Sequence, residues 1–202
     1  MRVDCARLGR SAARRARLGA AWRGQSMVEF AFCIPVFLLL LFGTFEVGML
    51  YKTHAAYDQA AQQAVRIAAS AGNAGNADAQ MLTALQHNLA SQDLNQITAA
   101  TVYDATVDGT PVPGSPQTIY VYSPSLGHFV CQGAPTALPC PAPTPPATYT
   151  YWDPLVRDTK VGELDHIGLR LTVRYRGPTG LLPPTTLFEG ATTLIEPNSY
   201  QP

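Results

Sequence analysis

An uncharged apolar run near the N-terminus constrains this chain more than any other feature. Residues 30–45 (FAFCIPVFLLLLFGTF) contain no charged side chain, and the run extends over residues 27–51 if Glu29 and Glu46 are tolerated near its ends. That length exceeds the roughly 20 residues that a helix needs to cross a bilayer core. Residues 38–42 are apolar on every face, whereas a core helix of a globular protein is usually amphipathic. The sequence therefore predicts one transmembrane helix.

Charge is divided unevenly between the two sides of this run. The whole chain balances 14 Lys and Arg against 14 Asp and Glu. Residues 1–24, however, hold seven Arg and one Asp, and the chain from Tyr51 onward holds seven basic and eleven acidic residues. Basic residues beside a span stay on the cytoplasmic side. We therefore expect a cytoplasmic N-terminus, an exported C-terminal part and no nucleic-acid partner.

Two other interpretations of the run stay open. A buried core helix would explain the apolar composition. A conventional secretory signal, cleaved near the small residue Ala55 or kept as an anchor, would explain the basic leader. The run is long for a signal peptide, and helical residues follow it where a polar cleavage region would be expected.

A short motif lies at the membrane edge. It reads RGQSMVEFA over residues 23–31, and its carboxylate, Glu29, is costly at the entrance of a membrane helix unless it has a partner or a function. Cleavage after Gly24 would make Gln25 the first residue and Glu29 the fifth. The new α-amino group of one subunit could then neutralise Glu29 of a neighbour in a bundle of staggered helices, where the low dielectric strengthens the pair.

The string RGQSMVEFAFCIPVFLLLLFGTFEVG resembles the TadE-like family of tight-adherence (Flp) pilus assembly proteins. A basic leader, a glycine and a glutamate at the fifth mature position are typical of the signal of type IV pilins and pseudopilins. The resemblance covers residues 23 to about 70, including the helix HAAYDQAAQQAVRIAAS at 54–70, and Ile195-Glu196-Pro197 is also reminiscent of the family.

The resemblance implies cleavage between Gly24 and Gln25 by a membrane-embedded prepilin peptidase, with Glu29 serving recognition or assembly. It implies a minor pilin or pseudopilin and not an enzyme, since 202 residues exceed the length of a major Flp pilin. Its partners would be the membrane, the peptidase, and other pilus-assembly proteins and pilin subunits bound by helix–helix packing. It would lie in the bacterial inner membrane as a single-pass protein, or outside the cell in a pilus.

Four segments follow from this interpretation. Residues 1–24 form the leader, 25–51 the transmembrane helix, 52–71 an Ala-rich helical extension, and 72–202 the exported domain. Pro35 lies inside the predicted span, where it removes one backbone hydrogen bond and bends the helix. The extension has small side chains at three- and four-residue spacing, and this stripe could pack on a partner subunit or on the protein's own sheet.

We expect the exported domain to be α+β. Asp78 is placed to cap a short helix carrying Met81, Leu82 and Leu85. Strand-like alternation marks residues 100–107, 118–122, 167–175 and 191–195, which predicts an antiparallel sheet of about four strands covered by helix on its apolar face. Between the second and third strands, residues 123–164 are rich in Pro and Gly, which predicts a surface loop.

The cysteines are divided by location. Cys131 and Cys140 are the pair in the exported part, where an oxidising compartment favours a local disulfide. His128 alone does not complete a zinc site, so we expect no metal and no cofactor. Two other functions stay open: a signal-anchored exported binding or adhesion module whose Pro-rich loop recognises a ligand, and an exported hydrolase whose site the motifs do not reveal.

Overall fold

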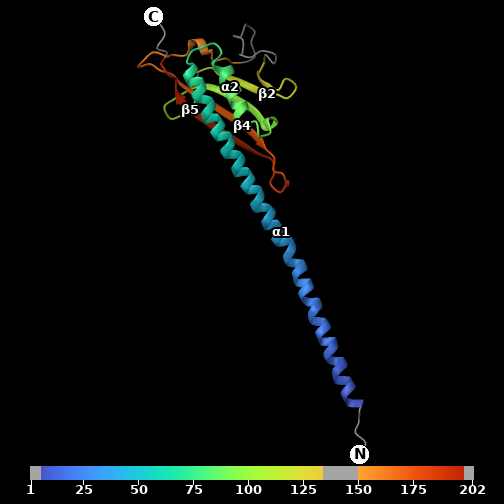
Figure 1. Ribbon diagram of the computed structural model, residues 1–202. Coiled ribbons are helices and arrows are strands. Elements are labelled where there is room, and N and C mark those ends of the chain that lie inside the picture. Colours follow the sequence, from blue (N-terminus) through green and yellow to red (C-terminus); the bar gives the residue numbers. More distant parts are fainter. Residues whose placement is uncertain (1–5, 134–149, 198–202) are drawn as a thin grey trace, which may run out of the picture. The chain divides into compact units, whose positions relative to one another are not determined.

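The computed structural model describes the backbone of residues 6–133 and 150–197, and the side chains from Met27 onward within those ranges. The chain divides into two compact units, Met1–Val47 and Gly48–Pro202, which are described separately below. Figure 1 shows the order of the elements along the chain.

The first unit consists of one helix. Helix α1 is assigned from Ala6 to Ala71, with Pro35 inside it, and its portion up to Val47 belongs to this unit. Large apolar side chains are exposed all around this portion, for example Phe32 at 75% and Leu40 at 63%. Within Met27–Ala71 a window of mean hydropathy 2.2 has the length and composition of a membrane span, and none of that window is buried.

The second unit packs two helices on one five-stranded antiparallel sheet, which confirms the α+β prediction. The end of α1 is followed by α2 (Ala77–Asn88), the short 3-10 turn η1 (Leu94–Gln96) and strand β1 (Ile97–Ala105). Strands β2 (Gln117–Ser123) and β3 (His128–Cys131) come next, then the 3-10 turn η2 (Pro154–Val156), β4 (His166–Tyr175) and β5 (Thr185–Leu194). The strand order is β3-β2-β1-β4-β5.

Strand β4 shows why the sheet has one dry face. Ile167, Leu169, Leu171 and Val173 are fully buried, while the alternate residues Arg170 and Arg174 are exposed. Successive side chains of a strand point to opposite faces, so the aliphatic set faces the helices. The alternation in the sequence predicted both the strand and its buried face.

The Ala-rich stripe of α1 packs inside the second unit. Ala61, Ala64 and Ala68 are 0% exposed and belong to the same core cluster as Val102 of β1 and Leu171 of β4. Small side chains let the helix axis approach a neighbouring surface closely, and here that surface is the protein's own sheet. The open question of which surface covers this stripe is therefore answered by the chain itself.

The sheet differs slightly from the expected number of about four strands. It has five, because His128–Cys131 forms β3 inside the segment that we expected to be a surface loop. The strand is short and flanked by Pro and Gly, so its alternation was hidden, yet it pairs with β2 and its Phe129 ring makes an edge contact with Tyr122 at 5.5 Å between centroids. The same segment also contains the buried Trp152.

The start of α2 differs from expectation as well. The N-cap residue is Asn76, without a side-chain capping bond, and Asp78 lies within the first turn. Asp78 is buried and is used for a different contact, described below. Before α2, Gly72 ends α1 with φ +59°, a left-handed conformation that favours glycine.

Candidate functional site

The predicted processing motif lies in α1. Gly24 and Gln25 are in helical conformation, and the structure describes only their backbone. Glu29 follows one turn later with an exposed side chain. The motif is therefore on the part of α1 that precedes the most apolar stretch.

Pro35 lies within α1 as predicted from the sequence. Because proline has no N–H, the carbonyl of Ala31 receives no helical bond from position 35. Cys33, two residues earlier, is a free and exposed cysteine.

The predicted disulfide concerns the end of β3. Cys131 is the last residue of this strand and is 1% exposed. Cys140 lies outside the described residues, so the pairing of Cys131 with Cys140 stays a prediction.

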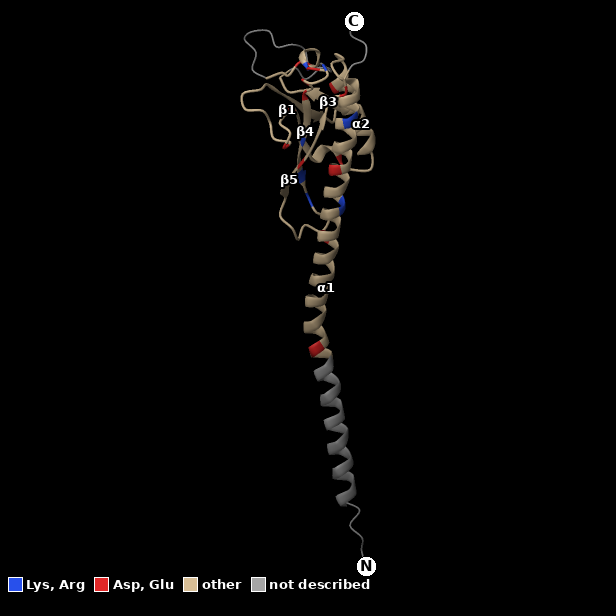
Figure 2. Ribbon diagram, turned by 90° about the vertical axis from the view of Figure 1, so that its left-hand side faces the viewer, with Lys and Arg blue, Asp and Glu red and all other residues tan. Residues whose placement is uncertain are grey.

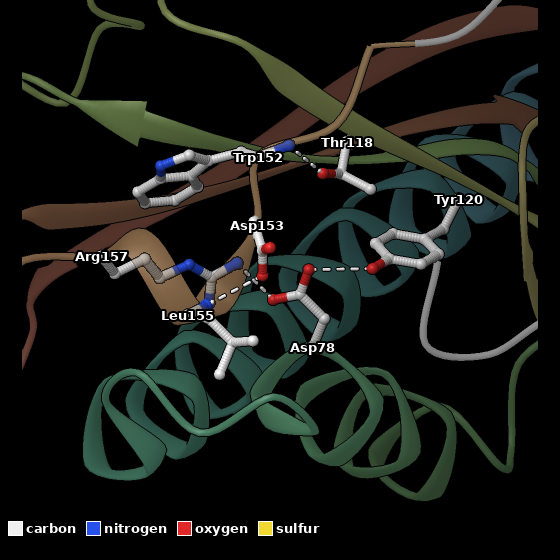
Figure 3. Close-up of polar contacts among 7 residues, drawn as sticks. All are labelled: Asp78, Thr118, Tyr120, Trp152, Asp153, Leu155 and Arg157. Carbon is white, nitrogen blue, oxygen red and sulfur yellow. Dashed lines mark hydrogen bonds and ion pairs between the residues drawn. The ribbon is translucent and has the colours of Figure 1, made fainter. Parts of the chain in front are cut away.

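The most developed polar arrangement in the second unit was missed by sequence reasoning. A buried ion pair joins Asp78 of α2 to Arg157, with Nη2 and Oδ1 separated by 2.6 Å and both side chains 0% exposed. The other carboxylate oxygen, Oδ2, accepts a hydrogen bond at 2.8 Å from the hydroxyl of Tyr120 on β2. Figure 3 shows these three side chains meeting between the helices and the sheet.

Neighbouring groups hold the arginine in place. The indole ring of Trp152 lies 4.3 Å from the Arg157 guanidinium, a cation–π arrangement. The backbone N–H of Trp152 donates to the Thr118 hydroxyl at 2.8 Å, and the Asp153 carboxylate accepts from the Leu155 N–H at 2.9 Å (Figure 3). The segment 150–157 is thereby fixed to β2 and α2.

This arrangement compensates the burial of the Asp78 carboxylate. Desolvation and the adjacent Asp78 carboxylate raise the pKa of Tyr120, so its hydroxyl stays a hydrogen-bond donor. Buried carboxylates need partners, and Asp78 has one on each oxygen. Because Asp78 and Arg157 lie 79 positions apart, no local pattern in the sequence links them.

A second polar side-chain contact connects α1 with the edge strand β5. His54 Nδ1 lies 2.9 Å from Glu189 Oε1, and the Glu189 side chain is 5% exposed. Desolvation raises the pKa of the Glu189 carboxyl above its ordinary value of 4.5, while His54 opposes the shift. In the part of the second unit that the structure describes, Glu189 is the second buried carboxylate, after Asp78.

One groove of the second unit, about 580 Å³ in volume, lies between α1 and α2. Its lining includes Gln63, Ile67, Thr83 and His87. Among the described residues, no group of three or more His, Cys, Asp or Glu is arranged to hold a metal ion.

Comparison with known proteins supports the family resemblance of the N-terminal segment. Residues 24–66 match the family model of TadE-like proteins. The resemblance predicted from the sequence is thereby confirmed for this TadE-like segment, which begins at Gly24 and ends in the buried Ala stripe of α1. No curated protein and no solved structure matches the chain.

The match also concerns the apolar part of α1. The TadE-like segment contains the whole apolar stretch and residues 24–31 of the predicted processing motif, and it indicates a part in tight-adherence pilus systems. A single N-terminal apolar helix agrees with membrane anchoring of such a protein.

Proposed function

We propose that this protein is a TadE-like minor pilin or pseudopilin that assembles or anchors a tight-adherence (Flp) pilus. The observation that carries the proposal is the match of residues 24–66, whose first residue is the glycine after which cleavage is expected. The leader, residues 1–24, is cytoplasmic, and residues 25–51 cross the inner membrane. The domain from residue 72 onward is exported, with the helical extension 52–71 leading into it.

Prepilin peptidase removes the leader in this proposal, cutting between Gly24 and Gln25. The new α-amino group then sits about 6 Å along the helix axis from Glu29. In a bundle of parallel helices, the amine of one subunit pairs with Glu29 of the next, and the low dielectric makes the pair strong. In this proposal the protein acts through helix–helix packing and not through catalysis.

Chemistry outside the membrane completes the proposal. The exported compartment is oxidising, and a disulfide between Cys131 and Cys140 closes a local loop after β3. Processing leaves seven basic and thirteen acidic side chains, so the mature protein is acidic.

The intact mass of the protein tests processing directly. Purified from a host that has a tight-adherence prepilin peptidase, the chain should have the mass of residues 25–202. Gly24→Val should keep the full mass, because a branched side chain blocks the cleavage position. Gly19→Val, a matched change in the same leader, should still be processed. A mature chain that starts at Met1 or near Ala56 in the unmodified protein would contradict the proposal.

A further inference from the structure

The outer face of the sheet, away from the helices, carries an arginine face. We use this name for Arg170 and Arg174 of β4 together with Phe188 of β5. Both arginines are exposed, and the Phe188 side chain is 69% exposed. Phe188 pairs with Thr172, the residue between the two arginines, so all three side chains project on one side of the sheet.

The arginine face is preorganised. The Arg170 guanidinium lies 5.4 Å from the centre of the Tyr103 ring, which is itself 3% exposed and anchored by a bond from its hydroxyl to the Gly109 carbonyl at 3.1 Å. Gly168 leaves room for that ring, since a Cβ atom there would come within 2.4 Å of it. Within the described part of the chain, neither Arg170 nor Arg174 has a carboxylate partner.

A surface of the opposite character lies on the segment before β4. We call it the acidic loop: the exposed aliphatic side chains Leu155 (65%), Val156 (69%) and Val161 (85%), together with Asp158 and Glu163, whose two carboxylates outnumber the one exposed cation between them, Lys160. Three exposed aliphatic residues in one short segment are unusual for a solvated loop, and they indicate a contact surface.

The acidic loop is fixed in shape. The Asp153 carboxylate caps the η2 turn, and the Asp165 carboxylate accepts from the Asp158 N–H at 2.7 Å. The Asp158 carboxylate accepts from the Lys160 N–H at 2.9 Å. Its aliphatic residues are therefore presented without a large ordering cost on binding. Lys and Arg are blue and Asp and Glu are red in Figure 2, where the charges around the sheet can be followed.

We propose that the exported domains of two copies of this chain associate head to tail, with the acidic loop of one copy seated on the arginine face of the next. The carboxylates of the loop meet Arg170 and Arg174, and the aliphatic residues cover Phe188. Two arginine faces repel each other, as do two acidic loops, so the charges favour the unlike pairing. Because the two surfaces differ, each copy keeps one of each free, and the contact extends into an open chain of subunits.

This contact is separate from the proposed membrane-helix bundle. Both surfaces lie in the second unit, and their pairing does not require cleavage after Gly24. Its failure would therefore leave the processing experiment unaffected, and failure of processing would leave this contact testable.

Cysteine cross-linking of the full chain tests the geometry. In a Cys5→Ser, Cys33→Ser background, one tagged copy carries Thr186→Cys, next to the arginine face, and a second copy carries Lys160→Cys in the acidic loop. Both positions are exposed, so neither change disturbs the core. In membranes treated with copper phenanthroline, the mixed pair should form a disulfide-linked dimer. Thr186→Cys alone and Lys160→Cys alone should not.

The charges are tested in the same assay. Arg170→Glu with Arg174→Glu should reduce the mixed cross-link about tenfold, whereas Arg66→Glu, an exposed change on α1, should leave it unchanged. Glu163→Arg on the loop-bearing copy should restore part of the yield, which a merely misfolded arginine face would not allow. Raising the salt concentration should weaken the unmodified contact. Equal cross-linking of identical copies, or no mixed cross-link at all, would overturn the proposal.

Discussion

At the scale of single residues, Asp78 shows how position alone can mislead. Its place at the start of a short amphipathic helix favoured a capping role, yet the cap residue is Asn76 and Asp78 points inward. The reason is Arg157, whose guanidinium occupies the interior beside α2. A charge in a dry core is tolerated only when it is paired, so the two residues depend on each other.

We expect Arg157→Leu to lower the free energy of unfolding by about 3–5 kcal/mol, because it leaves the Asp78 carboxylate buried without its cation. Urea unfolding of the full chain in detergent micelles measures this. A Trp22→Phe background leaves Trp152, which stacks on Arg157, as the only tryptophan reporter.

Two further variants make that result specific. Lys160→Leu, an exposed cation on the same segment, should change stability by less than about 0.5 kcal/mol. Adding Asp78→Leu to Arg157→Leu should recover much of the loss, since both charges then leave the core. Equal losses for the single and double variants would show that the ion pair itself is not what matters.

We expect the free energy of unfolding to depend on pH through Glu189. Its pKa is raised above 4.5 by desolvation, so the folded state binds a proton more tightly than the unfolded state does. The stability contributed by Glu189 is therefore complete below pH 4.5 and is lost as the pH rises through the raised pKa. Glu189→Gln should remove this part of the slope in urea unfolding measured from pH 4 to 7. Glu163→Gln, an exposed carboxylate, should retain it; the same slope in all three proteins would contradict the assignment.

At the scale of elements, α1 has two kinds of surface. In the first unit its apolar side chains are exposed, for example Phe37 at 62% and Leu41 at 47%. In the second unit its small side chains are buried against the sheet. The run of bulky apolar residues and the stripe of alanines were both visible in the sequence. The bulky residues lie where α1 is exposed, and the alanines lie where it packs on the sheet.

Close packing of the alanine stripe can be tested at Ala64, which is 0% exposed. Ala64→Leu inserts extra carbon atoms between helix and sheet and should destabilise the second unit by about 1–3 kcal/mol. Gln63→Leu, at the adjacent exposed position, places the same side chain in solvent and should be nearly neutral. Micelle-based urea unfolding reports both values, and similar behaviour of the two variants would mean that the stripe does not pack as described.

At the scale of the whole molecule, the neutral net charge conceals a sorted chain. The leader carries seven Arg and one Asp, and the remainder carries seven basic and thirteen acidic residues. In the proposed function, processing discards the basic part. What then acts outside the membrane is an acidic protein whose exposed arginines, such as Arg170 and Arg174, are available for pairing with carboxylates.

The assembly role of Glu29 can be separated from processing. We expect Glu29→Gln to leave the chain starting at Gln25 but to reduce pilus formation at least tenfold, because the amide cannot neutralise a neighbour's α-amino group. Electron microscopy of sheared filaments together with intact mass measures both effects. Glu196→Gln, an exposed carboxylate near the C-terminus, is the matched control and should form normal pili. Normal pili with Glu29→Gln would remove the assembly role from this residue.

The sequence by itself determined the apolar helix, the TadE-like segment and the α+β class. Each of these features is local in the sequence. They are an unbroken apolar run, a motif around Gly24 and Glu29, and alternation of apolar and polar residues such as that of β4. Local periodicity reflects which side of an element is dry, so it can be read without knowing what the element packs against.

Tertiary structure alone decided the rest. Strand β3 exists because β2 offers it a partner, although its four residues lie in a Pro- and Gly-rich segment. Asp78 and Arg157 meet across 79 positions, and the arginine face forms only when β4 and β5 lie side by side. Such contacts depend on which distant segments the fold brings together, and no local pattern carries that information.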